Sequence, residues 1–125
     1  NPAACLELAA AAVQTGDWDK AASAYSRVAE KEGDTPLSFA ARLNRAQVLM
    51  HKGDFAAARD EFGKLAASAP ADVVPVIRQQ QAEAAVAAGD KSGAVAAYEA
   101  AVTALPPTDK ESAAFFRSRI ASLKK

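Results

Sequence analysis

The sequence predicts an all-α protein built from three antiparallel helix hairpins and a C-terminal capping helix. Alanine, the strongest intrinsic helix former, accounts for 34 of the 125 residues, whereas only eight residues are aromatic. A Gly-Asp pair also recurs at Gly16-Asp17, Gly53-Asp54 and Gly89-Asp90, with spacings of 37 and 36 residues. A fixed period of this length is typical of proteins that stack helix pairs.

The first hairpin is expected in a repeat at about residues 2–34. Gly16 is suited to the left-handed backbone conformation that ends a helix, and Asp17 is a good N-cap for the next helix. In that second helix the apolar residues recur at steps of three and four, at Trp18, Ala21, Tyr25 and Val28. We therefore expect Trp18 to pack in the core of the hairpin rather than to serve as a platform for a ligand.

The same pattern predicts a second repeat at about residues 35–71 and a third at about residues 72–107. Each repeat has an alanine seven residues before its turn glycine, where a larger side chain would overpack the helix crossing. These alanines are Ala9, Ala46 and Ala82. The segment 73–77 looks like a short strand, but Pro75 suits the first turn of a helix and Asp72 is a candidate N-cap, so a helix is expected.

A capping helix is expected at about residues 108–125. Pro106 and Pro107 end the preceding helix, and Thr108 and Glu111 have the spacing of a capping box. Apolar side chains would then cover the last repeat, as terminal elements of repeat proteins do. The candidates for this role are Ala114, Phe115, Ile120 and Leu123.

Together, the small residues, the Gly-Asp turns and the terminal prolines resemble the tetratricopeptide repeat family, although the third turn has Lys91 in place of an aromatic residue. The resemblance covers nearly all of residues 1–125 and implies a single domain in which the hairpins form a right-handed superhelix. Where the family has a bulky residue early in the first helix, this chain has Cys5, Arg42 and Arg78. The long repeats, with Leu6-Glu7-Leu8-Ala9 and the segment 89–94, are similar to the periplasmic domain of the ancillary subunit of the bacterial SecYEG translocon.

The family resemblance also implies where a partner would bind, because the first helices of the hairpins line the concave side. The candidate protein-binding residues are Leu6, Gln14, Leu43, Gln47, Met50, His51, Gln79, Glu83 and Val86. This set is mostly apolar and lacks the convergent Lys, Arg and Asn that hold a C-terminal carboxylate in some family members. A partner with an extended or helical apolar stripe fits better, with Gln47 and Gln79 bonding its backbone. Alternatively, Leu6, Leu43 and Val76 pack only against neighbouring helices.

Several other functions have no support in the sequence. Fifteen basic and fifteen acidic residues leave no net charge to attract nucleic acid or an anionic membrane. The only histidine, His51, precedes the end of a helix, and no second ligand stands at metal-binding spacing, so we expect neither an enzyme nor a metal or cofactor site. The carboxylates of Asp60-Glu61 and of Asp109 and Glu111 are expected to be solvated.

The expected function is therefore that of a scaffold for protein–protein interaction. The alternative is a structural module that forms homodimers through an exposed first helix. The chain starts at Asn1 without a methionine, which indicates a trimmed or processed protein, and a signal or an anchor would have its place in the missing N-terminus. With an anchor, the domain would lie on the periplasmic side of the inner membrane, near translocon or envelope proteins; otherwise it would be cytoplasmic.

Overall fold

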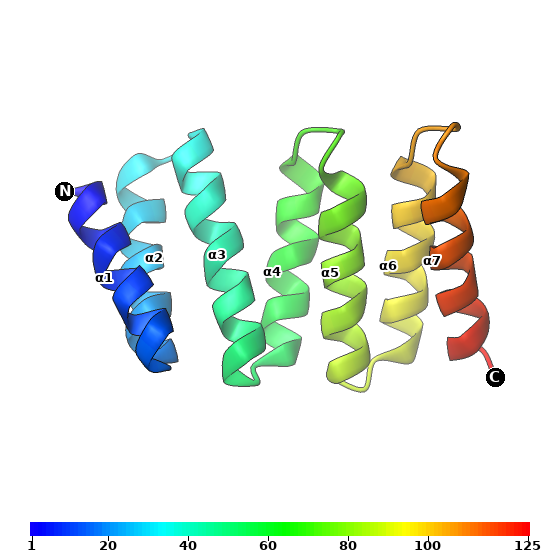
Figure 1. Ribbon diagram of the computed structural model, residues 1–125, viewed down its shortest axis with the longest axis horizontal. Helices are drawn as coiled ribbons and strands as arrows, with labels where there is room; N and C mark the ends of the chain where they lie inside the picture. The colour runs from blue at the N-terminus through cyan, green and yellow to red at the C-terminus, as the bar shows by residue number, and fades with distance from the viewer. The chain divides into compact units, whose positions relative to one another are not determined.

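The computed structural model describes residues 1–125 and contains seven α-helices and no strand, which confirms the all-α prediction (Figure 1). In chain order the helices are α1 (Pro2–Thr15), α2 (Trp18–Glu32), α3 (Pro36–Lys52), α4 (Phe55–Ser68), α5 (Val74–Ala87), α6 (Lys91–Ala104) and α7 (Lys110–Leu123). They belong to two compact units, residues 1–61 and residues 62–125, and α4 contributes its first half to unit 1 and its second half to unit 2.

Each of the three Gly-Asp pairs lies between two helices, as predicted, although the C-cap of α5 is Ala88 rather than Gly89. Gly16 and Gly53 have φ angles of 76° and 94°, a left-handed conformation that residues with a Cβ rarely adopt. Asp17 accepts a hydrogen bond from the amide of Lys20 at 3.3 Å, and Asp90 accepts one from Gly93 at 2.9 Å. These two carboxylates satisfy amides that lack partners inside α2 and α6.

Alanines fill the helix crossings in both units. Ala9 and Ala46 in unit 1 and Ala82 in unit 2 are completely buried, as expected from their places in the repeat. Trp18 is half-buried and packs beside the buried residues Ala12, Ala21 and Val48 of unit 1. The prediction that Trp18 packs in the hairpin core is thus confirmed, although its side chain is only partly buried.

Larger side chains complete the core of unit 2. Phe62, Leu65 and Ile77 are fully buried, and one cluster joins α5, α6 and α7 through Ala82, Ala97, Tyr98, Ala101 and Phe116. A Cβ on Gly63 in α4 would lie 3.0 Å from the side chain of Gln81 in α5. This close approach gives a packing reason for a glycine in the middle of α4.

The start of α5 differs in one detail from the prediction. Residues 74–87 are helical, so the expected helix is confirmed over the strand, and Pro75 lies in its first turn. Asp72 is not the N-cap, because it lies within a turn in which the amide of Val73 donates to the carbonyl of Pro70. Val73 occupies the N-cap position and makes no side-chain hydrogen bond there.

The capping helix α7 starts two residues later than predicted. Asp109, rather than Thr108, is its N-cap and accepts a hydrogen bond from the amide of Ser112 at 3.0 Å. The prolines at 106 and 107 explain the delay, because the amide of Asp109 first closes a turn on the carbonyl of Pro106. Aspartate is also the stronger capping residue of the two.

The aromatic side chain that covers the last repeat was also predicted wrongly. Phe115 is 47% exposed, whereas its neighbour Phe116 is 4% exposed and packs against Tyr98 with ring centroids 5.9 Å apart. Ile120 and Leu123 do pack against the same cluster, while Ala114 is exposed. The stripe of α7 that faces the core therefore consists of the buried Phe116 and the partly buried Ile120 and Leu123.

Candidate functional site

In unit 1 the predicted binding residues lie on α1 and α3, and none of them is fully buried. Gln14 and His51 are exposed, and the remaining four are partly exposed: Leu6, Leu43, Gln47 and Met50. Leu43, Gln47 and Met50 follow one another at steps of four and three, so they share one face of α3. Their use by a partner stays a prediction.

The last turn of α3 is tied to the start of α2 by contacts that the sequence did not reveal. The ring of His51 stacks on Trp18, with centroids 5.0 Å apart and planes within 15°. Next to it, the ammonium of Lys52 lies 2.7 Å from the carboxylate of Asp19 and 3.4 Å from that of Asp54. Hydrogen bonds to Asp19 and Asp54 raise the pKa of Lys52 above its usual 10.5.

The expectation that Glu61 is solvated is wrong. Its side chain is 9% exposed, and Oε1 lies 2.6 Å from Nη2 of Arg45 and 3.6 Å from Nε of Arg42. Arg45 also donates a hydrogen bond to the hydroxyl of Ser26 at 3.1 Å, so one guanidinium links α2, α3 and α4. Arg42, which departs from the family pattern, has an electrostatic partner in Glu61. Asp60, in contrast, is exposed.

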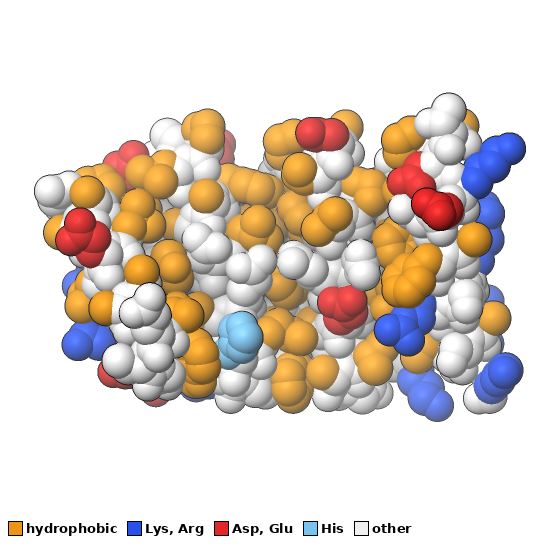
Figure 2. Space-filling view, in the orientation of Figure 1, with side chains coloured by type: hydrophobic (Ala, Val, Ile, Leu, Met, Phe, Trp, Pro, Cys, Tyr) orange, Lys and Arg blue, Asp and Glu red, His pale blue; other side chains and the backbone are white.

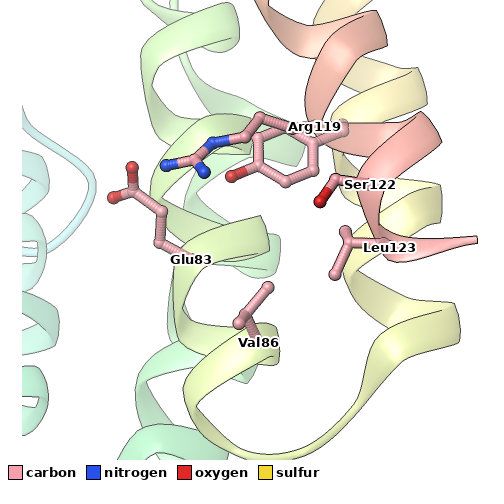
Figure 3. Close-up of a pocket in the computed structure, with 6 residues that line it drawn as sticks. Glu83, Val86, Arg119, Ser122 and Leu123 are labelled. Carbon is pink, nitrogen blue, oxygen red and sulfur yellow. The ribbon is translucent and has the colours of Figure 1, made fainter. Parts of the chain in front are cut away.

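In unit 2 a cleft of about 320 Å³ opens between α5 and α7 (Figure 3). This α5–α7 cleft is lined by Glu83, Val86, Tyr98, Arg119, Ser122 and Leu123. Figure 3 shows Glu83 and Val86 on one side of it, with the guanidinium of Arg119 extending across toward the Glu83 carboxylate. The volume lies at the lower end of the range of ligand pockets, about 300–1,000 Å³.

Two of the predicted binding residues, Glu83 and Val86, thus line a cleft, and Gln79 lies one turn before them on α5. Tyr98 of α6 and the three residues of α7 were not predicted from the sequence. A signal was available on α7, because Arg119 and Ser122 lie three residues apart and share one face of the helix. Tyr98 carried no such signal, because the same position is aromatic in each repeat and its spacing predicts a residue of the core.

The phenol of Tyr98 links the core of unit 2 to the α5–α7 cleft. The residue is 3% exposed, and it both packs on Phe116 and lines the cleft. Burial raises the pKa of Tyr98 above its usual 10.0, and the negative charge of Glu83 adds to this, whereas Arg119 opposes it. The hydroxyl is therefore a neutral hydrogen-bonding group in the cleft at neutral pH.

This pKa shift predicts how the stability of unit 2 depends on pH. Because the pKa of Tyr98 is higher in the folded state than its usual 10.0, the stability contributed by the neutral phenol is complete below about pH 10 and is lost as the pH rises through the folded pKa. As the pH rises from about 9 to about 12, Tyr98→Phe should lose less stability than the wild type, as measured by urea unfolding. Parallel losses in the two proteins would contradict the assignment.

No group of three or more His, Cys, Asp or Glu side chains lies close enough together to hold a metal ion. None of the seven helices has both the length and the apolar character needed to cross a bilayer.

A second, shallower recess of about 310 Å³ lies between α6 and α7 and is lined by Glu99, Val102, Thr103, Arg117, Ile120 and Lys124.

Comparison with known proteins identifies the repeat. The tetratricopeptide repeat family matches residues 6–73, which include the first two Gly-Asp turns and the whole of α2, α3 and α4. No curated protein sequence matches the chain. The match covers more than half of the 125 residues, and the helical hairpins are those that this repeat forms. The chain therefore belongs to the tetratricopeptide repeat family.

Proposed function

We propose that the protein is a non-catalytic module that holds a segment of a partner protein in the α5–α7 cleft. Tetratricopeptide repeats generally mediate protein–protein interaction. The observation that carries the proposal is the cleft itself, in which partly exposed apolar side chains stand beside charged and hydroxyl groups from α5, α6 and α7. Apolar clefts with a few convergent polar groups are the usual form of binding sites.

The lining of the cleft suits the side chain of a partner rather than a solvated surface. Val86 is 46% exposed, so covering it and the neighbouring Leu123 would remove apolar surface from water at a gain of about 25 cal/mol per Å². Glu83, Arg119 and Ser122 would bond the polar groups that flank the inserted side chain. The face of α3 with Leu43, Gln47 and Met50 offers a second surface of similar chemistry in unit 1.

We further propose that the partner is a bacterial envelope protein and that the module lies on the periplasmic side of the inner membrane. The support is the similarity of Leu6-Glu7-Leu8-Ala9, of the segment 89–94 and of the repeat spacings of 36 and 37 residues to the ancillary translocon subunit. An extract of bacterial envelopes is accordingly the source of partners for the experiment below.

Val86→Glu should reduce capture of the partner about tenfold or more, because a carboxylate would be desolvated next to Glu83 when the cleft fills. Thr103→Glu is the matched control, since it adds the same charge in the recess between α6 and α7. Immobilised wild type and both variants are incubated with envelope extract, and bound proteins are quantified by mass spectrometry after circular dichroism shows equal helicity. A partner retained equally by Val86→Glu would refute the cleft as the binding site.

A further inference from the structure

The large hydrophobic side chains that are most exposed all lie in unit 2. They are Val76 at 56%, Val86 at 46% and Phe115 at 47%. The two valines are on α5 and the phenylalanine is on α7, the two helices that border the α5–α7 cleft. Val86 lines the cleft, and Val76 and Phe115 lie on the same two helices outside its lining. Exposed apolar side chains that gather on two helices beside one cleft indicate an interaction site.

Each of the two helices presents an ordered stripe. On α5, residues 76, 79, 83 and 86 are separated by three, four and three positions, so they share one face. The amide of Gln79 donates to the Glu83 carboxylate at 3.2 Å, which provides this charge with a partner on its own helix. On α7, Phe115 and Arg119 are four positions apart, and the guanidinium lies 5.4 Å from the centre of the ring.

Helix α7 and the two residues after it are basic overall, and Arg119 is the basic residue that lines the α5–α7 cleft, whereas Arg117 and Lys124 line the recess between α6 and α7. From residue 110 to the C-terminus there are five basic side chains and one acidic side chain, Glu111; the basic residues are Lys110, Arg117, Arg119, Lys124 and Lys125. Figure 2 shows Lys and Arg side chains gathered along the edge of the molecule that α7 occupies in Figure 1. A partner that contacts α7 is therefore favoured if it carries negative charge on that side.

We infer that the partner segment that inserts a side chain into the α5–α7 cleft is an amphipathic helix, with an apolar stripe for the exposed valines and an acidic flank for α7. The inference rests on the proposed function and specifies its partner. Val76 and Val86 are ten residues apart, so they are separated by about 15 Å along α5, close to three helical turns. A helix with apolar residues at intervals of three and four matches this length, and its acidic flank meets Arg119.

The geometry disfavours an anionic membrane as the occupant, although α7 is basic. A helix that inserts into a membrane interface exposes a continuous apolar face. The apolar stripe of α7 is instead packed in the core of unit 2, through Phe116, Ile120 and Leu123. Only Phe115 is left exposed on this helix among the large hydrophobic side chains.

The test uses synthetic peptides of about 18 residues, which is five helical turns. The acidic peptide has a leucine stripe at intervals of three and four and glutamates along one flank. One control has lysines in place of the glutamates, and another has the acidic composition with two central prolines that prevent a helix. Affinity for the full chain is measured by fluorescence anisotropy at about 50 and about 200 mM NaCl, because salt screens such contacts.

We expect the acidic peptide to bind about tenfold or more tightly than either control, and its affinity to fall at the higher salt concentration. Arg119→Glu should weaken it about tenfold, whereas Arg117→Glu, which makes the same charge change beside the other recess, should weaken it less than about threefold. Both arginines are exposed, so both variants are expected to fold.

Equal binding of the acidic and lysine peptides, or equal effects of the two arginine variants, would overturn the inference. Binding to vesicles of anionic lipid that depends on Arg119, without binding of the acidic peptide, would overturn it in favour of a membrane. If Val86→Glu abolishes partner capture while the peptides bind alike, the helical partner is refuted and the proposed function stands. If Val86→Glu has no effect on capture, both the proposed function and the inference of a helical partner are refuted.

Discussion

Phe116→Ala is expected to detach α7 from unit 2 and to lower the stability of this helix by about 3–4 kcal/mol, the cost of truncating a buried phenylalanine. Phe116 is 4% exposed and is the only fully buried side chain that α7 contributes to the core. The matched control is Phe115→Ala, which removes the same atoms from a side chain that is 47% exposed. Its cost should be within about 0.5–1 kcal/mol.

Amide hydrogen exchange measured by NMR would distinguish the two variants residue by residue. Because α7 is a terminal element whose main packing partner is α6, it should open locally while the rest of the repeat stays folded. Trp18 is the only tryptophan and lies in unit 1, so its fluorescence should be unchanged in Phe116→Ala. Protected α7 amides in Phe116→Ala, or equal losses in both variants, would contradict the assigned packing.

Detachment of α7 would also remove part of the α5–α7 cleft. Arg119, Ser122 and Leu123 all lie on α7, so the cleft loses one wall when this helix detaches. Phe116→Ala should therefore abolish partner capture although the substituted side chain is buried and does not line the cleft. Capture that survives the detachment of α7 would show that the partner uses another surface, such as the exposed face of α3.

The predictable part of the fold is the part encoded by neighbouring residues. A left-handed glycine followed by a capping aspartate ends one helix and starts the next, and both requirements are local. The buried alanines were also predictable, because a helix crossing at a fixed place in each repeat admits only a small side chain. Even here the N-caps of α5 and α7 were misplaced, since turns that close on Pro70 and Pro106 delay both helices.

The site was predictable only in part, because a side chain's neighbours come from other helices. Glu83 and Val86 were identified from the family resemblance, but Tyr98, Arg119 and Leu123 join them through packing between helices. The choice between Phe115 and Phe116 shows the same limit. Spacing with Ile120 and Leu123, four and seven residues on, favours Phe116, yet the two residues are adjacent and only the rotation of α7 against α6 decides between them.

The burial of Glu61 on α4 could not be predicted from neighbouring residues either, because its arginine partners lie on α3. Glu61→Ala is expected to destabilise unit 1 by about 2–3 kcal/mol, because it leaves Arg42 and Arg45 without their shared carboxylate in a largely buried site. The cost should be below the full value for a buried ion pair, since the two arginine side chains are 32% and 29% exposed and water partly solvates them. Asp60→Ala is the matched control, with a carboxylate that is 63% exposed, and should cost no more than about 0.5 kcal/mol.

Urea unfolding followed by the fluorescence of Trp18 measures this effect, because the indole lies in the same unit as Glu61. Glu61→Gln separates the two contributions of the carboxylate: the amide oxygen still accepts a hydrogen bond from Arg45 but brings no charge, so an intermediate loss is expected. If Glu61→Gln is as stable as the wild type, hydrogen bonding rather than charge joins α3 to α4. Equal midpoints for Glu61→Ala and Asp60→Ala would mean that the contact at 2.6 Å contributes nothing to folding, and the departure of Arg42 from the family pattern would then have no structural reason.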